Sequence, residues 1–124
     1  LTTIEEDPDG VNDASTDGRS FAVGGGVAKA VVNVIQHRYP GREVKVASSQ
    51  GLRECRKMMQ EAVAGKYPGY LLEGMACPGG CVAGAGTITP VKKSTAAVGK
   101  YVADAKVRTI QDSAAVKRLR EVQD

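Results

Sequence analysis

The chain alternates between helical and extended patterns of apolar residues, and this alternation limits its possible folds more than any other feature. Apolar side chains recur at helical spacing from residue 27 to 35, and a Tyr-Pro-Gly sequence that begins at residue 39 ends that helix. A short strand is predicted at 43–48, an amphipathic helix over 51–65 and a second strand at 70–75. Helix, strand, helix, strand is the order of an α/β fold, so we expect a small, mostly parallel sheet covered by helices.

The remaining helices are predicted from their apolar stripes and their ends. The apolar stripe of the 51–65 helix consists of Leu52, Cys55, Met59 and Ala62. We expect Met58 and Met59 to be packing residues and not cofactor contacts. A third helix is predicted over 97–106, and the last one starts after Ser113, whose hydroxyl suits an N-cap. The apolar side of that last helix consists of Val116, Leu119 and Val122.

The chain divides into a short acidic lead, 1–19, and one domain, 20–124. The lead has few apolar residues and several Asp-Pro and Asp-Gly turn signals, so we expect an irregular linker there. The first 18 positions carry six acidic and no basic side chains, which leaves 17 basic and eight acidic ones for the rest. A chain of 124 residues is long enough for one domain with a modest core and too short for two.

The composition argues against several classes of protein. A basic body can attract nucleic acid, but aromatic residues, on which bases could stack, make up only 4% of the chain, so we do not expect nucleic-acid binding. No apolar run approaches the length of about 20 residues that crosses a bilayer. Three cysteines are an odd number, which favours reduced thiols or metal ligands over a secreted disulfide framework and predicts a cytoplasmic location.

Two of the cysteines stand in a glycine-rich segment directly after the second predicted strand. Cys77 and Cys81 enclose Pro-Gly-Gly within the string E-G-M-A-C-P-G-G-C-V-A-G-A-G-T. Ligands gather at the carboxyl ends of parallel strands, which is where this segment begins. Thiolates bind metal, and glycines let main-chain N–H groups turn inward to hydrogen-bond the sulfide of a cluster. The segment therefore predicts a metal or cluster site.

The spacing of the cysteines by itself leaves other kinds of site open. A structural zinc site has comparable spacing but needs four ligands, and only Cys55 and His37 remain as further candidates. A thioredoxin-type redox pair usually has two intervening residues, and a thioredoxin-like 2Fe-2S carrier needs two more cysteines upstream. We expect Cys55 to pack on the apolar face of its helix, and His37 to interact with the carbonyl groups at the end of its own.

The string E-G-M-A-C-P-G-G-C resembles the third cysteine motif of the iron-only hydrogenase catalytic domain, which reads roughly E-V-M-A-C-P-G-G-C before a glycine run. The segment G-R-S-F-A-V-G-G-G-V-A-K-A-V resembles the phenylalanine- and glycine-rich start of a helix in that family. Residues 43–59 resemble its following strand and helix, and residues 100–122 its closing segment. The resemblance runs from about residue 20 to the end, and it implies the second lobe of a two-lobed catalytic domain.

This resemblance implies a cofactor and a role for each residue of the motif. The family's cofactor is a 4Fe-4S cubane joined through one cysteine sulfur to a two-iron subsite that carries CO and cyanide. By motif match, Cys77 would ligate the cubane and Cys81 would be the bridging ligand, so both would be metal ligands. Met75 would pack beside the two-iron unit and would be a catalytic residue together with Cys81. Gly79 and Gly80 would bring the main chain close to the cofactor.

The resemblance extends to the glycine-rich helix start, with some departures from the family. Phe21, Gly25 and Gly26 would line the opposing wall of the cofactor site. Many members have Glu at the position of Lys29, and Thr or Ser is common at the position of Gly24. The run after the second cysteine is V-A-G-A-G-T and not a plain glycine run. These differences suggest a divergent branch.

The implied activity belongs to an intact parent protein. That activity is the reversible oxidation of H2 to protons and electrons, with a ferredoxin-like protein as electron partner. The other cluster cysteines would come from an N-terminal lobe that this chain lacks, so we expect the separate chain to be inactive. The alternative is a non-catalytic iron–sulfur scaffold, a hydrogen sensor or an electron-transfer module.

Overall fold

Two parallel strands, β1 (Lys45–Gln50) and β2 (Tyr70–Met75), form the sheet in a computed structural model that describes residues 14–123. Their register pairs Lys45 with Tyr70 and Gln50 with Met75, so both strands end at the same edge of the sheet. Helix α3 (Leu52–Val63) makes the crossover between them. The described residues thus form the small α/β fold with a parallel sheet that the sequence predicts.

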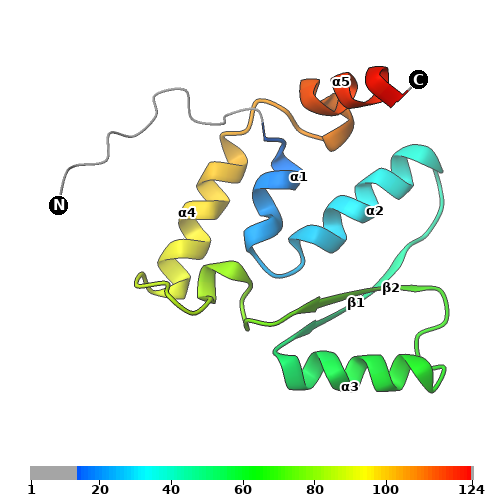
Figure 1. Cartoon of the computed structure of the whole chain (residues 1–124), viewed down its shortest axis with the longest axis vertical. Coiled ribbons are helices and arrows are strands. Elements are labelled where there is room, and N and C mark those ends of the chain that lie inside the picture. Colours follow the sequence, from blue (N-terminus) through cyan, green and yellow to red (C-terminus); the bar gives the residue numbers. More distant parts are fainter. Residues whose placement is uncertain (1–13, 124) are drawn as a thin grey trace.

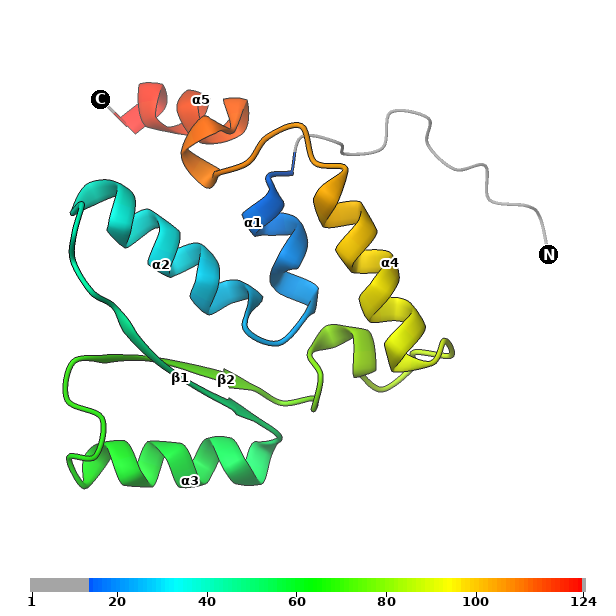
Figure 2. The same cartoon turned by 180° about the vertical axis from the view of Figure 1, so that it is seen from behind.

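Helices cover both faces of this sheet. α2 (Gly26–Arg38) lies on one face and α3 on the other (Figure 1, and from behind in Figure 2). α1 (Thr16–Arg19), α4 (Val91–Ala103) and α5 (Ala114–Gln123) lie on the side of α2 that faces away from α3. Short 3₁₀ turns occupy 20–22, 81–83 and 110–112. None of the helices within residues 14–123 has the length and apolar character that a membrane span requires.

The central elements lie close to the positions that the sequence predicts. The Tyr-Pro-Gly sequence ends α2, where the Tyr39 amide donates to the Ile35 carbonyl (2.8 Å). β2 occupies the predicted positions. β1 is shifted by two residues toward the carboxyl end, because its pairing with β2 continues as far as Met75.

The two carboxyl-terminal helices agree less well with the sequence. α4 begins six residues before its predicted start because Pro90 suits the position before a first turn, and its carbonyl accepts from the Lys93 amide (2.9 Å). α5 follows Ser113 as predicted, and the Ser113 carbonyl accepts from the Lys117 amide (3.0 Å). The apolar side predicted for α5 is only partly covered, since Leu119 is exposed.

The end of the acidic lead is helical and packed, which contradicts the expectation of an irregular segment up to residue 19. Ser15 caps α1 by accepting from the Gly18 amide (3.1 Å), and Asp17 and Arg19 are buried. The Arg19 guanidinium donates to the Tyr101 carbonyl (2.7 Å) and lies 4.0 Å from the centre of its ring. The lead is thus fixed to α4 by a cation–π contact that acidic composition does not reveal. Residues 1–13 lie outside the described range.

The buried face of α3 differs from the predicted stripe. Leu52 is 74% exposed and Met59 57%, whereas Met58 is 6% exposed and belongs to the core. The sheet beneath α3 is two strands wide, so it covers only the narrow line of side chains that points directly at it. The expectation that Met59 is a packing residue is therefore wrong, and the one for Met58 is confirmed.

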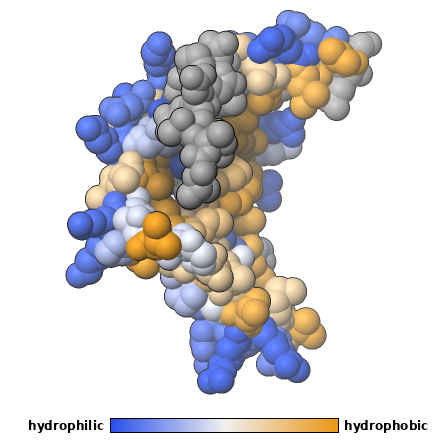
Figure 3. All heavy atoms as spheres, turned by 60° about the vertical axis from the view of Figure 1, so that its left-hand side comes forward, coloured by the Kyte–Doolittle hydropathy of each residue, from blue (hydrophilic) through white to orange (hydrophobic). Residues whose placement is uncertain are grey.

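The core within residues 14–123 is small. The buried apolar residues are Ala28, Ala30, Met58, Val82 and Ala105, and none of the described large side chains is fully buried. Many large apolar side chains remain exposed instead, and Figure 3 shows apolar surface spread over much of one face of the molecule. Many large apolar side chains of the described residues therefore still contact water.

Candidate functional site: the cysteine cavity

Both loop cysteines border one cavity at the carboxyl end of β2. Cys77 is half-buried and Cys81 is exposed. The cavity measures about 270 Å³, and we call it the cysteine cavity; its lining consists of Gly74, Met75, Ala76, Cys77, Gly80 and Cys81. The structure thus brings together four of the predicted site residues, namely Met75, Cys77, Gly80 and Cys81, and the arrangement can present two thiolates to one metal centre.

The turn between the cysteines depends on glycine. Gly79 and Gly80 have φ values of 98° and 93°, which disfavour residues with a side chain. The Gly80 amide donates to the Cys77 carbonyl (2.9 Å), which closes the turn. A Cβ atom at Gly80 would lie 2.6 Å from the Ala22 carbonyl oxygen and 2.8 Å from the Gly24 amide nitrogen. The glycine-rich segment before α2 therefore packs main chain against main chain on the cysteine turn.

The predicted site residues in the glycine-rich segment before α2 do not line the cysteine cavity. Gly24 donates its amide hydrogen to the Gly79 carbonyl (3.3 Å), so this part of the segment contacts the cysteine turn. Phe21, Gly25 and Gly26 are not part of the lining of the cysteine cavity, and the Phe21 side chain is exposed. Gly26 instead packs on the carbonyl of Ser20, where a Cβ atom has no room. Their role in the opposing wall of a cofactor site remains a prediction.

Gln50 is a site residue that the sequence analysis missed. Its side-chain oxygen Oε1 accepts from the Gly79 amide (2.7 Å), and its Nε2 occupies the space beside Gly24. The register places Gln50 opposite Met75, at the edge of the sheet where the cysteine segment begins. A polar residue at the last position of the first strand is the signal that could have identified it, once parallel pairing was expected.

The third cysteine supports the site and does not border it. The Cys55 thiol donates to the carbonyls of Ser49 (3.6 Å) and Met75 (3.5 Å). Its sulfur lies 3.2 Å from the place that a Cβ atom at Gly74 would take. Cys55 thus packs beneath the carboxyl ends of both strands, as the sequence predicts for a residue on the inner side of its helix.

The other soft ligand that the sequence offers is remote from the cysteines. His37 lies in the last turn of α2, as predicted, and borders a separate cavity with Val34, Arg38 and Gln111. Among the described residues, no group of three or more His, Cys, Asp or Glu side chains is placed to hold a metal ion. Within residues 14–123, the ligands offered to one centre are therefore the cysteine pair.

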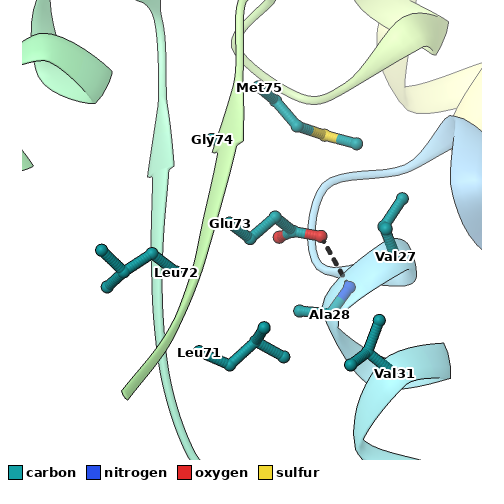
Figure 4. Close-up of a pocket in the computed structure, with 8 residues that line it drawn as sticks. All are labelled: Val27, Ala28, Val31, Leu71, Leu72, Glu73, Gly74 and Met75. Atoms are coloured by element: carbon teal, nitrogen blue, oxygen red, sulfur yellow. Dashed lines mark hydrogen bonds between the residues drawn. The ribbon is translucent and has the colours of Figure 1, made fainter. Parts of the chain in front are cut away.

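A buried carboxylate lies on the strand that leads into the cysteine segment. Glu73 is 8% exposed, and its Oε1 accepts from the Ala28 amide (2.9 Å) in the first turn of α2. Its Oε2 accepts from the Ser48 hydroxyl (2.9 Å) on β1. Figure 4 shows Glu73 and Met75 on the same side of β2, with Leu72 on the other. One carboxylate thus connects both strands and α2 next to the site.

An exposed pair at the far end of α3 has shifted pKa values. A hydrogen bond from Lys66 (2.9 Å), followed by one from Tyr67, lowers the pKa of Glu61 below its usual 4.5. The same bond to Glu61 raises the pKa of Lys66. This pair is an exposed salt bridge on the helix surface and does not contact the cysteine cavity.

The residues of the cysteine cavity fit an iron–sulfur cofactor. Two cysteine residues border one open space together with Gly74 and Gly80, and cysteine sulfur is the usual ligand of such a cluster. Cys81 is an exposed residue on this cavity. Two cysteines on one open cavity are ligands of the kind that iron–sulfur clusters use.

Comparisons with known proteins identify the family of the chain. The model of the family "Iron only hydrogenase large subunit, C-terminal domain" matches residues 1–85, which include the lead and exclude the closing segment 100–122. The chain is 43% identical over 61 residues to the periplasmic [Fe] hydrogenase large subunit of Nitratidesulfovibrio vulgaris, covering 49% of this chain and 13% of that protein. It is 42% identical over 48 residues to a protein of Drosophila mojavensis named "Probable cytosolic Fe-S cluster assembly factor", covering 38% and 10%.

The extent of these matches decides what they establish. The chain spans roughly a tenth of the length of each of these curated relatives. The family model, by contrast, covers well over half of the chain, including the glycine-rich helix start, both strands and both loop cysteines. The chain therefore belongs to the family of the C-terminal domain of the iron-only hydrogenase large subunit.

Proposed function

We propose that this chain is the part of an iron-only hydrogenase-like oxidoreductase that supplies two of the cysteine ligands of the catalytic cluster. The observation that carries the proposal is the position of Cys77 and Cys81 on one open cavity at the carboxyl end of β2. In the intact parent protein, the activity would be the reversible oxidation of H2, with a ferredoxin-like electron partner. Family membership supports this reading, and both loop cysteines lie inside the matched range.

The residues of the cysteine segment divide the task of holding the cofactor. Cys77 would ligate the 4Fe-4S cubane, and Cys81 would bridge it to the two-iron subsite, which is the group that supplies the hydrogen chemistry when bound. Met75 borders the same cavity and would shield the cofactor from water on that side. Gly79 and Gly80 fix the turn through positive φ angles, so the two sulfurs keep their relative positions.

The remaining ligands would come from an N-terminal lobe of the parent protein. A cubane needs four ligands, and the loop of this chain offers Cys77 and, through its bridge, Cys81. We therefore expect the separate chain to bind no stable cofactor and to have no hydrogenase activity. A cytoplasmic location remains part of the proposal. One relative is named as a periplasmic protein, so the location needs a test of its own. Cell fractionation of the parent protein is that test.

A second candidate function is a non-catalytic iron–sulfur scaffold. The similarity to a protein named as an assembly factor favours it, because that protein shares 42% identity over 48 residues with this chain. Lys29, at a position where many hydrogenases have Glu, also favours a divergent role, and its side chain is exposed on α2. Such a scaffold would carry a cubane on the same cysteines without the two-iron subsite.

Infrared spectroscopy of the anaerobic parent protein separates the two candidates. The parent would be produced with an iron source and the hydrogenase maturation proteins, and iron, infrared bands of bound CO and cyanide, and H2-dependent reduction of methyl viologen would be measured. Bands together with H2 oxidation support the enzyme. A cubane signal without these bands supports the scaffold, and absence of iron from the matured parent refutes both. The variant Cys55→Ser is the control for loss of a cysteine as such. It should keep the iron of the parent, because the Cys55 thiol lies outside the cysteine cavity.

A further inference from the structure

Glu73 is a buried carboxylate to which the proposed function gives no role. Its side chain is 8% exposed, and the structure gives it no ion pair within the described part of the chain. A buried charge without a counter-ion is costly, so it persists only where hydrogen bonds stabilise it. The hydrogen bonds of Glu73 must therefore offset the cost of its burial.

Both carboxylate oxygens of Glu73 have hydrogen-bond donors. Its two oxygens accept from the Ala28 amide and the Ser48 hydroxyl, both at 2.9 Å. The Ala28 amide belongs to the first turn of α2, where the helix dipole presents its positive end. Both oxygens therefore act as acceptors, which is the hydrogen-bonding pattern of a carboxylate.

The same charge lies next to the residues of the cofactor site. Glu73 and Met75 are separated by one residue, and both point toward α2 from β2 (Figure 4). Both border a cavity of about 220 Å³ between α2 and β2, and Met75 also borders the cysteine cavity. Glu73 precedes Cys77 by four residues, a span of at most about 14 Å of extended chain.

We propose that the ionised carboxylate of Glu73 lowers the reduction potential of the iron–sulfur cluster held by the cysteine segment; the inference rests on the proposed function. Reduction adds one electron from an external reductant to the iron of the cluster, and no bond forms or breaks. A fixed negative charge nearby repels that electron and favours the oxidised cluster. The main-chain span of about 14 Å serves only as the order of the charge-to-cluster separation; with an effective dielectric constant of about 20, one unit charge then changes the oxidised-to-reduced ratio at fixed potential roughly sevenfold.

The test replaces the charge while keeping the shape. Glu73→Gln retains an oxygen for the Ala28 amide and an amide group for the Ser48 hydroxyl, so the fold loses a charge and little else. Glu73→Asp retains the charge. Glu43→Gln is the control, because Glu43 is exposed and precedes the amino end of β1, at the sheet edge opposite the cysteine segment. The matured parent protein and each variant are titrated with dithionite, and the cluster signal is followed by electron paramagnetic resonance.

The variants should differ in midpoint potential according to the charge at residue 73. Glu73→Gln should shift the midpoint potential to a more positive value. The shift should correspond to roughly a sevenfold change in the oxidised-to-reduced ratio. Glu43→Gln and Glu73→Asp should keep a midpoint potential near that of the parent. Equal midpoints for Glu73→Gln and the parent overturn the proposal and leave the proposed function intact. Loss of iron in Glu73→Gln, with iron retained in Glu73→Asp, also overturns it in favour of a structural role. A parent protein without any cluster signal refutes the proposed function as well.

Discussion

Replacing Gly80 by alanine tests whether the cysteine turn is fixed by main-chain contact. Gly80 has φ 93° and ψ −165°, a conformation that is nearly restricted to glycine and that costs an alanine about 1–3 kcal/mol. The new Cβ atom would also lie 2.6 Å from the Ala22 carbonyl oxygen and 2.8 Å from the Gly24 amide nitrogen. Both neighbours are main chain and cannot rotate away, so the backbone must move, which costs about 1–3 kcal/mol more.

The matched control for Gly80→Ala is Gly86→Ala. Gly86 has φ 92°, but a Cβ atom there would meet nothing within 4 Å. Alanine at this position therefore carries strain from a positive φ without the collision. Urea unfolding of both variants should show Gly80→Ala to be less stable than Gly86→Ala by about 1–3 kcal/mol, the part that belongs to the collision. In the matured parent protein, only Gly80→Ala should lose iron. Equal losses of stability in the two variants would refute the close approach of the two glycine-rich segments.

Three further predictions address other contacts of the site and of the surface. Serine at either of the two loop cysteines should abolish iron retention by the matured parent, whereas Cys55→Ser should retain it, as an iron assay will show. Gln50→Ala removes the acceptor of the Gly79 amide, a bond worth about 1 kcal/mol, so hydrogen exchange of that amide should accelerate about fivefold, and Gln60→Ala should not change it. The pKa of Glu61 is lowered, so its stabilising contact with Lys66 is present above pH 4.5 and is lost as the pH falls through the lower folded-state value. Urea midpoints of Glu61→Gln should therefore fall less on acidification than those of the unchanged chain, and equal acid sensitivity would contradict the shift.

The sequence predicts those features of the fold that local pattern determines. Helical spacing and the Tyr-Pro-Gly stop define α2, and two short apolar runs separated by an amphipathic helix define β1, α3 and β2. The prediction from sequence is wrong where the burial of a side chain depends on how many strands lie beneath its helix. Leu52 and Met59 belong to a regular apolar stripe, yet a sheet of two strands is too narrow to cover them. Periodicity gives the direction of an apolar face and does not give the width of its partner.

The site shows the same division between local and distant information. The cysteines and their glycines are recognisable because they stand together in the chain. Gln50 and Glu73 are not recognisable as site residues, because their effect depends on the parallel register that brings Gln50 to the cysteine turn, and on the packing of α2 that gives Glu73 its amide partner. The end of the lead is a further case, since Arg19 is fixed by Tyr101, which lies 82 positions later.

The departure from the family at Gly24 has a physical explanation in Gln50. A Cβ atom at residue 24 would lie 2.5 Å from Gln50 Nε2 and 3.1 Å from Cδ, so the common Thr or Ser would compete with the glutamine for the same space. In this chain the glutamine fills that space, and its Oε1 accepts a hydrogen bond from the Gly79 amide, which fixes the cysteine turn from the side of β1. The two positions are thus coupled, and their substitutions should not be additive. Gly24→Ser should destabilise the chain by displacing Gln50, but it should have little effect once Gln50 is alanine and the space is free. Additive changes in the free energy of unfolding in that double-mutant cycle would show that the two residues are independent. The presence of glycine at position 24 would then need a cause other than Gln50.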